Sequence, residues 1–411
     1  MKSESCDVAV IGAGPAGSVA SAMLASKGWD VQVLERQHFP RFSIGESLLA
    51  QSIALLDEAG LLQDVLDHGF QYKDGAAFAW GGRYTDIYFP NKSTPGPGTT
   101  FQVRRDMFDD VLIKGAQKKG ARVSFGDTVT AFRSDETGAV LTVAAETGEA
   151  REVRCRFALD ASGFGRILPR LLDLEKPSGF DRRRSVFRHV MDNIDDPTFD
   201  RNKILVSVNP HQPQIWYWLI PLADGMSSMG AVGPDKEIEA YGANPEERLT
   251  NLAAQAERMS EVLIFFFEQK TAYEIVGFAA NVKSLVGPSY ALLGNAAEFL
   301  DPVFSSGVTI AMKSAVLASG LADRQLRGGA VDWQGEFVEE LKTGVETFRA
   351  CVGAWYDGTL QRIIFNRPRD DNQVTAYLTS VLAGYAWDKT NPLVREPARF
   401  LRIVDELCEQ A

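Results

Sequence analysis

Three glycines near the start of the chain stand at a spacing that binds phosphate groups. Gly12, Gly14 and Gly17 follow the apolar run Val8–Ile11 and precede a helix-like stretch. In this arrangement the first glycine permits a tight turn, the second lets the backbone approach a pyrophosphate, and the third lets helix and strand pack closely. A second apolar run ends at Glu35, whose carboxylate can accept hydrogen bonds from an adenosine ribose. The segment therefore predicts a dinucleotide site.

Two tryptophans in the segment WYWLIP, residues 216–221, could build an aromatic wall. In a β-strand the side chains alternate between the two faces, so Trp216 and Trp218 would point to one side. Two neighbouring indoles form a large, rigid surface that can screen a reactive centre. The other interpretation is an aromatic strand that only fills a core.

Lys73 lies in YKDGAAFAWG, residues 72–81, just before an apolar strand-like run. A buried lysine has a lowered pKa and can act both as a hydrogen-bond donor and as a neutral amine. The alternative for a single lysine is a solvated side chain without a chemical role. Its position relative to the other motifs decides between these interpretations.

A second glycine-containing turn begins after Tyr290 and runs into a long apolar helix. Ser306, Gly307 and Val308 fall at the junction between loop and helix, where backbone N–H groups can bind an anion without a cation. The alternative is that the glycines here only let a cofactor approach the backbone.

The elements that must position these residues belong to an ordinary globular protein. The chain has 411 residues, 45% hydrophobic and 24% charged, with a net charge of −11 and no long basic run, so we expect no nucleic acid partner. Four distant cysteines and four histidines show no metal or disulfide spacing and fit a reducing compartment. The opening residues MKSESCD lack the apolar region of a signal peptide, and the most apolar run, VLIFFF at 262–267, is too short to span a membrane. We therefore expect a cytoplasmic protein without a metal ion or membrane contact.

The order of strand-like and helix-like segments predicts an α/β protein in three parts. Residues 1–180 and 286–328 are expected to form a discontinuous Rossmann-type core, and residues 181–285 an inserted antiparallel sheet on the substrate side. Residues 329–411 are expected to form a helical C-terminal region or lid. Many aromatic residues in this last part are explained by core packing.

Several dispersed segments resemble the motifs of FAD-dependent hydroxylases. LLGNAAEFLDP resembles their second FAD signature, with Asn295 in place of the usual aspartate, and LDASG at 159–163 resembles their middle motif. FQVRRDMFDDVL at 101–112 resembles the segment with a FAD-contacting arginine, for which Arg105 matches better than Arg104. The resemblance implies FAD as the cofactor. The residues it implies for binding are Gly12, Gly14, Ala16, Gly17, Glu35, Arg36, Ser47, Arg105, Asp160, Gly294, Asn295, Asp301, Pro302 and Gly307.

A narrower resemblance, over roughly residues 5–320, is to the flavin-dependent halogenases. WYWLIP matches their W-x-W-x-I-P motif, and F-x-x-P-x-x-S-x-G fits residues 299–307. The resemblance implies that Lys73 is the essential lysine and that a wall separates flavin from substrate. It implies a halide site, chloride or bromide, at Ser306, Gly307 and Val308, and a separate flavin reductase that supplies reduced FAD. The wall residues are Trp216, Trp218, Ile220 and Pro221.

The implied reaction converts halide, oxygen and reduced flavin into hypohalous acid, which then halogenates an electron-rich aromatic ring. Tryptophan halogenases carry a glutamate before the halide loop, whereas this chain has Phe304. We therefore expect a phenol or a pyrrole, either as a small molecule or tethered to a carrier protein, rather than free tryptophan. His189 could be a base near the substrate, although a strand histidine is more often structural. Two alternatives are a flavin hydroxylase or prenyl reductase, and a degenerate flavoprotein that acts as a binding factor.

Overall fold

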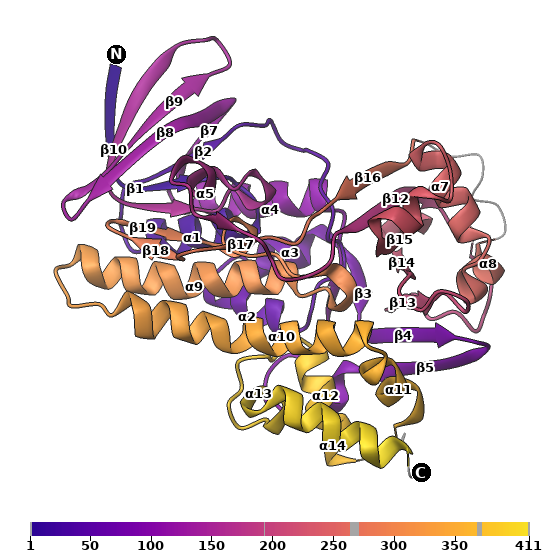
Figure 1. Cartoon of the computed structure of the whole chain (residues 1–411). Coiled ribbons are helices and arrows are strands. Elements are labelled where there is room, and N and C mark those ends of the chain that lie inside the picture. The colour runs from indigo at the N-terminus through magenta and orange to yellow at the C-terminus, as the bar shows by residue number, and fades with distance from the viewer. Residues whose placement is uncertain (1, 193, 264–270, 368–371, 410–411) are drawn as a thin grey trace.

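The computed structural model describes residues 2–192, 194–263, 271–367 and 372–409. A largely parallel sheet and a mostly antiparallel sheet lie beside each other, and the C-terminal helices lie along one side of the molecule (Figure 1). This arrangement confirms the expected fold class: a Rossmann-type core, an antiparallel second sheet and a helical C-terminal region.

The first sheet is built on buried parallel strands. β1 pairs in parallel with β2 and β10, and the antiparallel β8–β9 hairpin extends β10. Val8 and Val10 on β1 are fully buried, as expected for a parallel strand covered on both faces. The strands are β18 (Val286–Gly287), β19 (Tyr290–Leu292), β10 (Ala150–Asp160), β1 (Lys2–Ile11), β2 (Val31–Glu35), β7 (Arg122–Phe125), β8 (Asp127–Asp135) and β9 (Gly138–Ala145).

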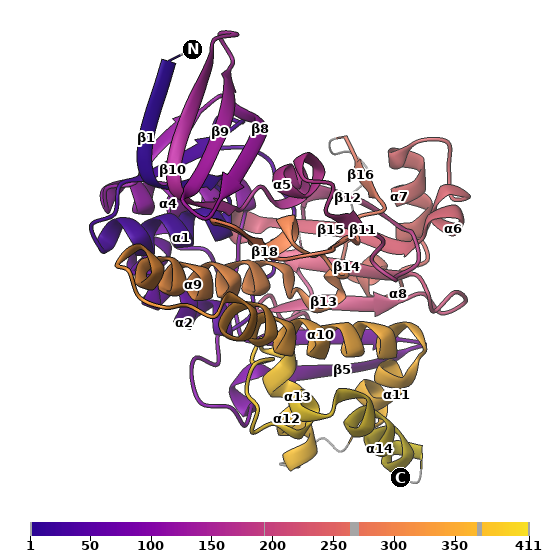
Figure 2. The same ribbon diagram turned by 60° about the vertical axis from the view of Figure 1, so that its left-hand side comes forward.

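Helix α1 connects β1 to β2 and packs against both α4 and α9, which come from distant parts of the chain (Figure 2). Ten of its twelve residues are buried, many of them alanine, glycine or serine, so helices and strands approach closely here. The helices of this part are α1 (Pro15–Ser26), α2 (Gln51–Glu58), α3 (Leu62–His68), α4 (Arg105–Lys118), α5 (Ile167–Leu171) and α9 (Gly307–Leu326).

The second sheet has the order β16-β12-β15-β14-β13-β4-β5 and is antiparallel except where β4 runs parallel to β13. β4 and β5 lie in the expected range of the first part, 1–180, but the pairing of β4 with β13 places them in the second sheet. Short helices α6 (Asp235–Glu239), α7 (Pro245–Ala253) and α8 (Glu257–Val262) cover its outer face. The strands are β16 (Tyr273–Val276), β12 (Arg183–Met191), β15 (Met226–Pro234), β14 (Trp216–Pro221), β13 (Lys203–Val208), β4 (Gly75–Trp80) and β5 (Arg83–Tyr88).

The C-terminal helices share one hydrophobic core with the first sheet. Phe348 and Trp355 on α10 are fully buried in the same apolar cluster as Val8 of β1. The elements are the π-helix η6 (Trp333–Glu339), α10 (Glu340–Tyr356), α11 (Thr359–Asn366), α12 (Gln373–Leu382), α13 (Pro392–Arg395) and α14 (Pro397–Glu409).

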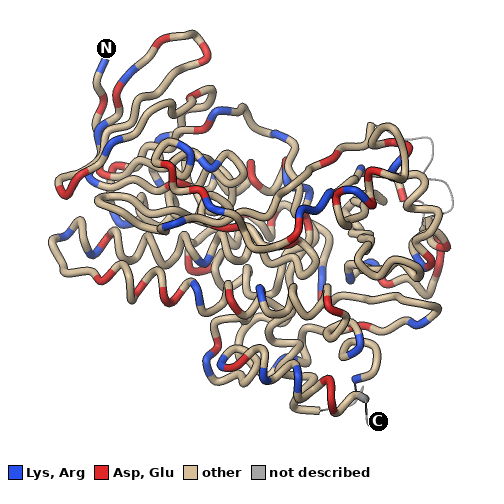
Figure 3. Tube along the Cα trace, in the orientation of Figure 1, with Lys and Arg blue, Asp and Glu red and all other residues tan. Residues whose placement is uncertain are grey.

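Basic and acidic side chains are interspersed along the trace of the described residues (Figure 3). The apolar run at 262–267 lies mostly outside the described residues. No helix in the described part of the chain is long and apolar enough to span a membrane.

Candidate active site

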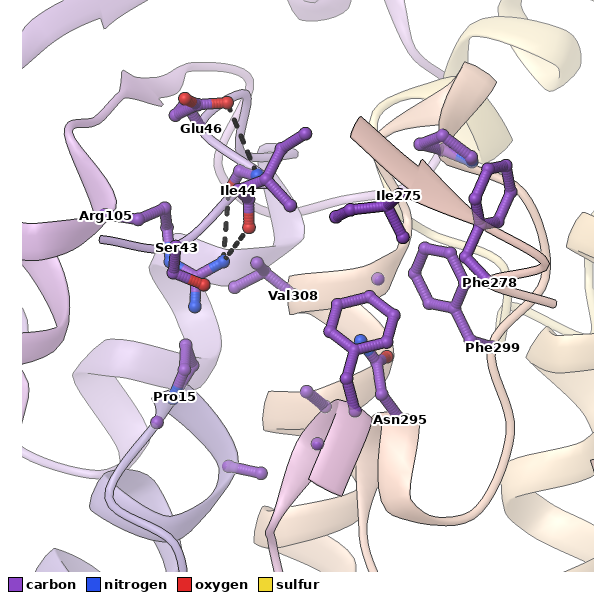
Figure 4. Close-up of a pocket in the computed structure, with 18 of the residues that line it drawn as sticks. Pro15, Ser43, Ile44, Glu46, Arg105, Ile275, Phe278, Asn295, Phe299 and Val308 are labelled. Carbon is purple, nitrogen blue, oxygen red and sulfur yellow. Dashed lines mark hydrogen bonds between the residues drawn. The ribbon is translucent and has the colours of Figure 1, made fainter. Parts of the chain in front are cut away.

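A cavity of about 430 Å³ lies where the carboxyl ends of β1 and β2 meet the inner face of the second sheet. Figure 4 shows Ser43, Ile44, Glu46 and Arg105 on one side of this pocket, across from aromatic side chains on the other. Ligands of open α/β sheets bind at this edge, beyond the carboxyl ends of the strands.

The glycine turn between β1 and α1 has the geometry that a dinucleotide needs. Gly12 has a φ of +96°, and a Cβ atom there would lie 2.6 Å from the Ala161 carbonyl oxygen. A Cβ atom on Gly17 would lie 1.9 Å from the Gly12 oxygen, so only glycine lets α1 pack on the turn. Gly14 faces the pocket, and the nearest atom to a Cβ placed on it would be a guanidinium nitrogen of Arg41 at 3.6 Å. The turn therefore fits a pyrophosphate.

Glu35 ends β2 beside this turn and lines the pocket, as does Arg36. Its carboxylate accepts hydrogen bonds from the backbone N–H groups of Ala13, at 2.8 Å, and Gln37, at 2.9 Å. These bonds fix the carboxylate at the pocket edge, where the ribose of a dinucleotide would lie. Ala16, in the first turn of α1, also lines the pocket.

Arg105 begins α4 and holds the loop that forms one side of the pocket. Its guanidinium donates to the Ile44 carbonyl oxygen at 2.6 Å (Figure 4) and pairs with Asp109 at 2.8 Å. Arg41 reaches the same carboxylate at 3.3 Å. Arg104, the alternative from the sequence, instead pairs with the neighbouring Asp106 and does not line the pocket.

Two predicted cofactor-binding aspartates lie behind the pocket wall instead of lining it. Asp160 is fully buried and accepts hydrogen bonds from the N–H groups of Ser162, at 2.9 Å, and Leu168, at 2.7 Å. It therefore shapes the turn at 161–163, which does line the pocket. Asp301 accepts a hydrogen bond from Tyr356 at 2.8 Å, and burial raises the pKa of its carboxyl to about 6.

Of the predicted site residues in the loop before α9, some line the pocket and others lie behind its wall. Ser305 adopts the left-handed conformation, with a φ of 55°, and the first turn of α9 then faces the pocket. Gly294 stays behind the wall, where a Cβ atom would lie 2.8 Å from that of Ala311. Ser306 is also buried outside the lining. The predicted residues of this loop that line the pocket are Asn295, Pro302, Gly307 and Val308.

The segment WYWLIP forms strand β14 in the middle of the second sheet. Trp216, Trp218 and Ile220 line the pocket, whereas Tyr217 and Leu219 pack under the outer helices. The two indole rings lie 5.9 Å apart, and the Trp218 N–H donates to the Ser228 hydroxyl at 3.1 Å. Pro221, the fourth predicted wall residue, ends the strand and does not line the pocket.

Lys73 lies at the end of β3 (Gln71–Lys73), one hydrogen bond away from the pocket. Its amine donates to the Ser47 hydroxyl and to the Leu48 carbonyl oxygen, both at 2.7 Å. Ser47 lines the pocket, and Lys73 itself is 1% exposed and does not. Burial lowers the pKa of Lys73 to about 7, so neutral amine and ammonium coexist near neutral pH. The Phe89 ring lies 5.1 Å from the amine.

Some residues that shape the site were not predicted from the sequence. Arg166, with a φ of 47°, donates to the carbonyl oxygens of Asn295, Ala296 and Ala297 and so holds the loop before α9. His189, which the sequence suggested as a base, does not line the pocket. Its ring pairs with the buried Glu46 at 2.7 Å, and this pair connects Glu46 of the pocket lining to β12. Only the three-dimensional fold brings these partners together. The described residues contain no group of three His, Cys, Asp or Glu side chains that could hold a metal ion.

Comparison with known proteins identifies the family. Residues 5–333 match the family model described as the FAD binding domain. This chain belongs to that FAD-binding family. The family match supports FAD as the cofactor, and the glycine turn, Glu35 and the first turn of α9 line one cavity.

The proteins of known activity to which this chain is similar include flavin-dependent halogenases. The chain is 30% identical to a tryptophan 2-halogenase from Chondromyces crocatus, over 80% of this chain and 63% of that protein. It is 28% identical to a 1H-pyrrole-2-carbonyl-[peptidyl-carrier protein] chlorinase from Pseudomonas fluorescens, over 78% and 76% of the two chains. Among solved structures, a flavoprotein/dehydrogenase from Cytophaga hutchinsonii is 40% identical, with a TM-score of 0.95 and 99% coverage of both chains.

Proposed function

We propose that this FAD-dependent protein is a halogenase. It would use reduced FAD, oxygen and halide to make hypohalous acid, and then halogenate an electron-rich aromatic ring. The observation that supports this most strongly is the joint position of Trp216, Trp218 and Lys73. The two indoles line the pocket in which FAD would bind, and the buried amine donates a hydrogen bond to Ser47 of the same pocket.

The pocket residues have distinct roles in this proposal. Gly12 and Gly14 would hold the pyrophosphate, Glu35 the ribose, and Asn295 the ribityl chain. When bound, reduced FAD supplies the electrons that activate oxygen. The N–H groups of Gly307 and Val308, at the positive end of the α9 dipole, would bind chloride or bromide beside it.

Lys73 can act on hypohalous acid in two ways. As an ammonium it can donate a hydrogen bond that makes the halogen more electrophilic. As a neutral amine it can form an N–halogen bond, releasing water, and then transfer the halogen to a ring carbon that loses a proton. Its pKa of about 7 is compatible with both, since both protonation states are populated. The indoles of Trp216 and Trp218 would keep the ring away from the flavin.

The substrate that we propose is a phenol or a pyrrole. Phe304 takes the place of the glutamate of tryptophan halogenases, and its ring packs edge-to-face on Trp355 at 5.8 Å. This position offers no carboxylate to activate an indole, whereas phenols and pyrroles activate themselves through their own heteroatom. The similarity to a chlorinase of a carrier-bound pyrrole supports a carrier-tethered form of this substrate. The similarity to a tryptophan 2-halogenase is the reason to test free tryptophan as well.

A second candidate is a FAD-dependent oxidoreductase that does not halogenate. The 40% identity to a flavoprotein/dehydrogenase over 99% of the chain favours it, because that similarity exceeds the similarity to the named halogenases. A hydroxylase or a prenyl reductase would use the same FAD site and would not require the tryptophan wall.

The decisive experiment supplies reduced FAD from a separate flavin reductase, with oxygen and either chloride or bromide. Phenols, pyrroles, their carrier-bound thioesters and free tryptophan are offered, and the products are read by mass spectrometry. We expect a halogen-specific mass shift on a phenol or pyrrole that disappears in Lys73→Met while FAD stays bound. Lys92→Met is the matched control, since Lys92 also has a lowered pKa and lies outside the pocket lining.

The other outcomes are equally informative. Addition of oxygen without halogen would favour the hydroxylase. Preferred halogenation of tryptophan would contradict the substrate class that we propose. Rapid reduction of bound FAD by NADPH alone would contradict the need for a separate reductase. Bound FAD that does not react with oxygen after reduction would support a binding factor instead of an enzyme.

A further inference from the structure

Two consecutive hydrogen bonds connect the indole of Trp216 to the loop before α9. Its N–H donates to the Tyr356 hydroxyl at 2.9 Å, and this hydroxyl donates to the Asp301 carboxylate at 2.8 Å. Asp301 stands directly before Pro302, on the loop that leads into α9. One tyrosine at the end of α10 therefore bridges the wall and the loop on the proposed halide side.

Tyr356 is itself held in place from two directions. The Arg183 guanidinium carbon lies 3.3 Å from the centre of its ring, a close cation–π contact. The Gln214 side chain donates to the Tyr356 carbonyl oxygen at 2.6 Å and accepts from Arg183 at 2.9 Å. The phenol ring therefore has little freedom to turn away from Trp216.

Two other tryptophans show that this bridge is specific. Trp218, the second wall indole, donates only to Ser228 on the adjacent strand. Trp355 is fully buried and its N–H has no acceptor among the described residues, so this fold does not give every buried indole a partner there. Trp216 instead has a partner outside the family match, which ends at residue 333.

We propose that Tyr356 is a positioning residue, whose hydroxyl fixes the orientation of the Trp216 indole and couples the wall to the Asp301 loop. Without this hydroxyl, a buried N–H and a buried carboxylate both lose a partner, which favours rotation of the indole or entry of water. The consequence for catalysis rests on the proposed function. A displaced wall would let hypohalous acid or activated oxygen escape before the substrate is reached.

The geometry can be tested without any assumption about the reaction. In the 411-residue protein loaded with FAD, the seven tryptophan indole N–H signals are recorded by ¹H–¹⁵N NMR. Trp216→Phe and Trp355→Phe assign two of them. We expect the Trp216 proton downfield of the Trp355 proton in the wild type, and shifted upfield in Tyr356→Phe. Ser228→Ala should move the Trp218 signal and leave that of Trp216 in place.

The functional consequence is measured as the ratio of halogenated product to hydrogen peroxide per reduced flavin consumed. We expect this ratio to fall about tenfold in Tyr356→Phe, the effect of losing one buried orienting hydrogen bond, with FAD affinity unchanged within about twofold. Tyr385→Phe is the matched control, because its hydroxyl bonds to the Pro97 carbonyl oxygen and contacts neither Trp216 nor Asp301.

Each outcome decides one point. An unchanged Trp216 signal in a folded Tyr356→Phe variant would overturn the bridge. Equal shifts of the Trp216 and Trp355 protons in the wild type would also overturn it, and this comparison does not require the variant to fold. A shifted signal with an unchanged product ratio would overturn the positioning role. If the wild type does not halogenate at all, the proposed function fails, while the NMR comparison still decides whether Tyr356 orients the indole.

Discussion

Lys73 is the residue whose protonation most directly controls the proposed chemistry. Burial lowers its pKa to about 7, so the neutral amine becomes the major form above that pH. If the amine carries the halogen, the halogenation rate should rise with pH and level off above about pH 7. If the ammonium acts as a donor, the rate should fall over the same range. Single-turnover rates measured between pH 5.5 and 9 with chemically reduced FAD separate these roles.

The variant Lys73→Arg also separates the role of Lys73 as a hydrogen-bond donor from its role as a halogen-carrying amine. Lys73→Arg keeps a hydrogen-bond donor that stays protonated at every accessible pH. An active Lys73→Arg variant without a pH step near 7 would support the donor role, and an inactive variant that still binds FAD would support the amine.

Asp301 gives the molecule a distinct dependence of stability on pH. Its carboxyl has a pKa of about 6 in the folded protein, above its ordinary value of 3.8, because it is buried. The folded state therefore binds this proton more tightly, and its stabilising contribution is present below pH 3.8 and lost as pH rises through about 6. Between pH 4 and 7 we expect the free energy of unfolding of the wild type to fall by roughly 2–3 kcal/mol through this carboxyl. Asp301→Asn cannot ionise and should not show this fall.

Urea unfolding at several pH values measures this difference. Asp323→Asn is a suitable control, because its ion pairs and hydrogen bonds hold the Asp323 pKa below its ordinary value and predict the opposite trend. Parallel stability curves for wild type and Asp301→Asn would show that Asp301 does not titrate in this range.

At the scale of elements, the sequence predicted the backbone better than it predicted the side-chain directions. Glycine spacing and period-two alternation fix where a turn opens and which face of β14 meets the core. Asp160 and Asp301 lie in the right segments but behind the pocket wall, because motif spacing does not reveal whether a carboxylate turns toward the ligand or toward its own backbone. Partners from distant elements, such as His189 for Glu46, follow only from the fold.

The turn between β1 and α1 permits a prediction that separates packing from binding. Gly17→Ala would force a Cβ atom to 1.9 Å from the Gly12 oxygen, so we expect a loss of several kcal/mol of stability. Gly14→Ala meets no atom within 3.5 Å and has an ordinary backbone conformation, so the protein should fold normally. Its methyl group would point toward the bound pyrophosphate and weaken FAD binding by about tenfold or more.

Thermal unfolding of the FAD-free protein and a fluorescence titration with FAD provide the two readouts. Gly353→Ala is the control for a helical glycine, since a Cβ atom there meets nothing within 4 Å. Normal stability in Gly17→Ala, or normal FAD affinity in Gly14→Ala, would contradict the roles assigned to these glycines.

At the scale of the whole molecule, the C-terminal helices are better described as part of the core than as a lid. Trp355 of α10 packs on Phe78 of β4 and on Phe304 before α9, and the three rings are buried. The loop at 91–100 is fastened to the same region, since the Ser380 hydroxyl accepts the Thr94 N–H at 3.1 Å. A lid would share fewer buried contacts with the parts that it covers.

Truncation tests this distinction. Removal of residues 330–411 would expose the apolar faces of β4 and α9, and we expect a chain that aggregates or loses cooperative unfolding and FAD. Removal of α14 alone takes away the partly exposed ion pair of Asp405 with Arg362 and the buried side chains of Leu401 and Val404, so the remainder should unfold cooperatively at a lower temperature. A truncated 1–329 protein that still folds and binds FAD would instead support a lid, because a part that only covers the site is not needed to build it.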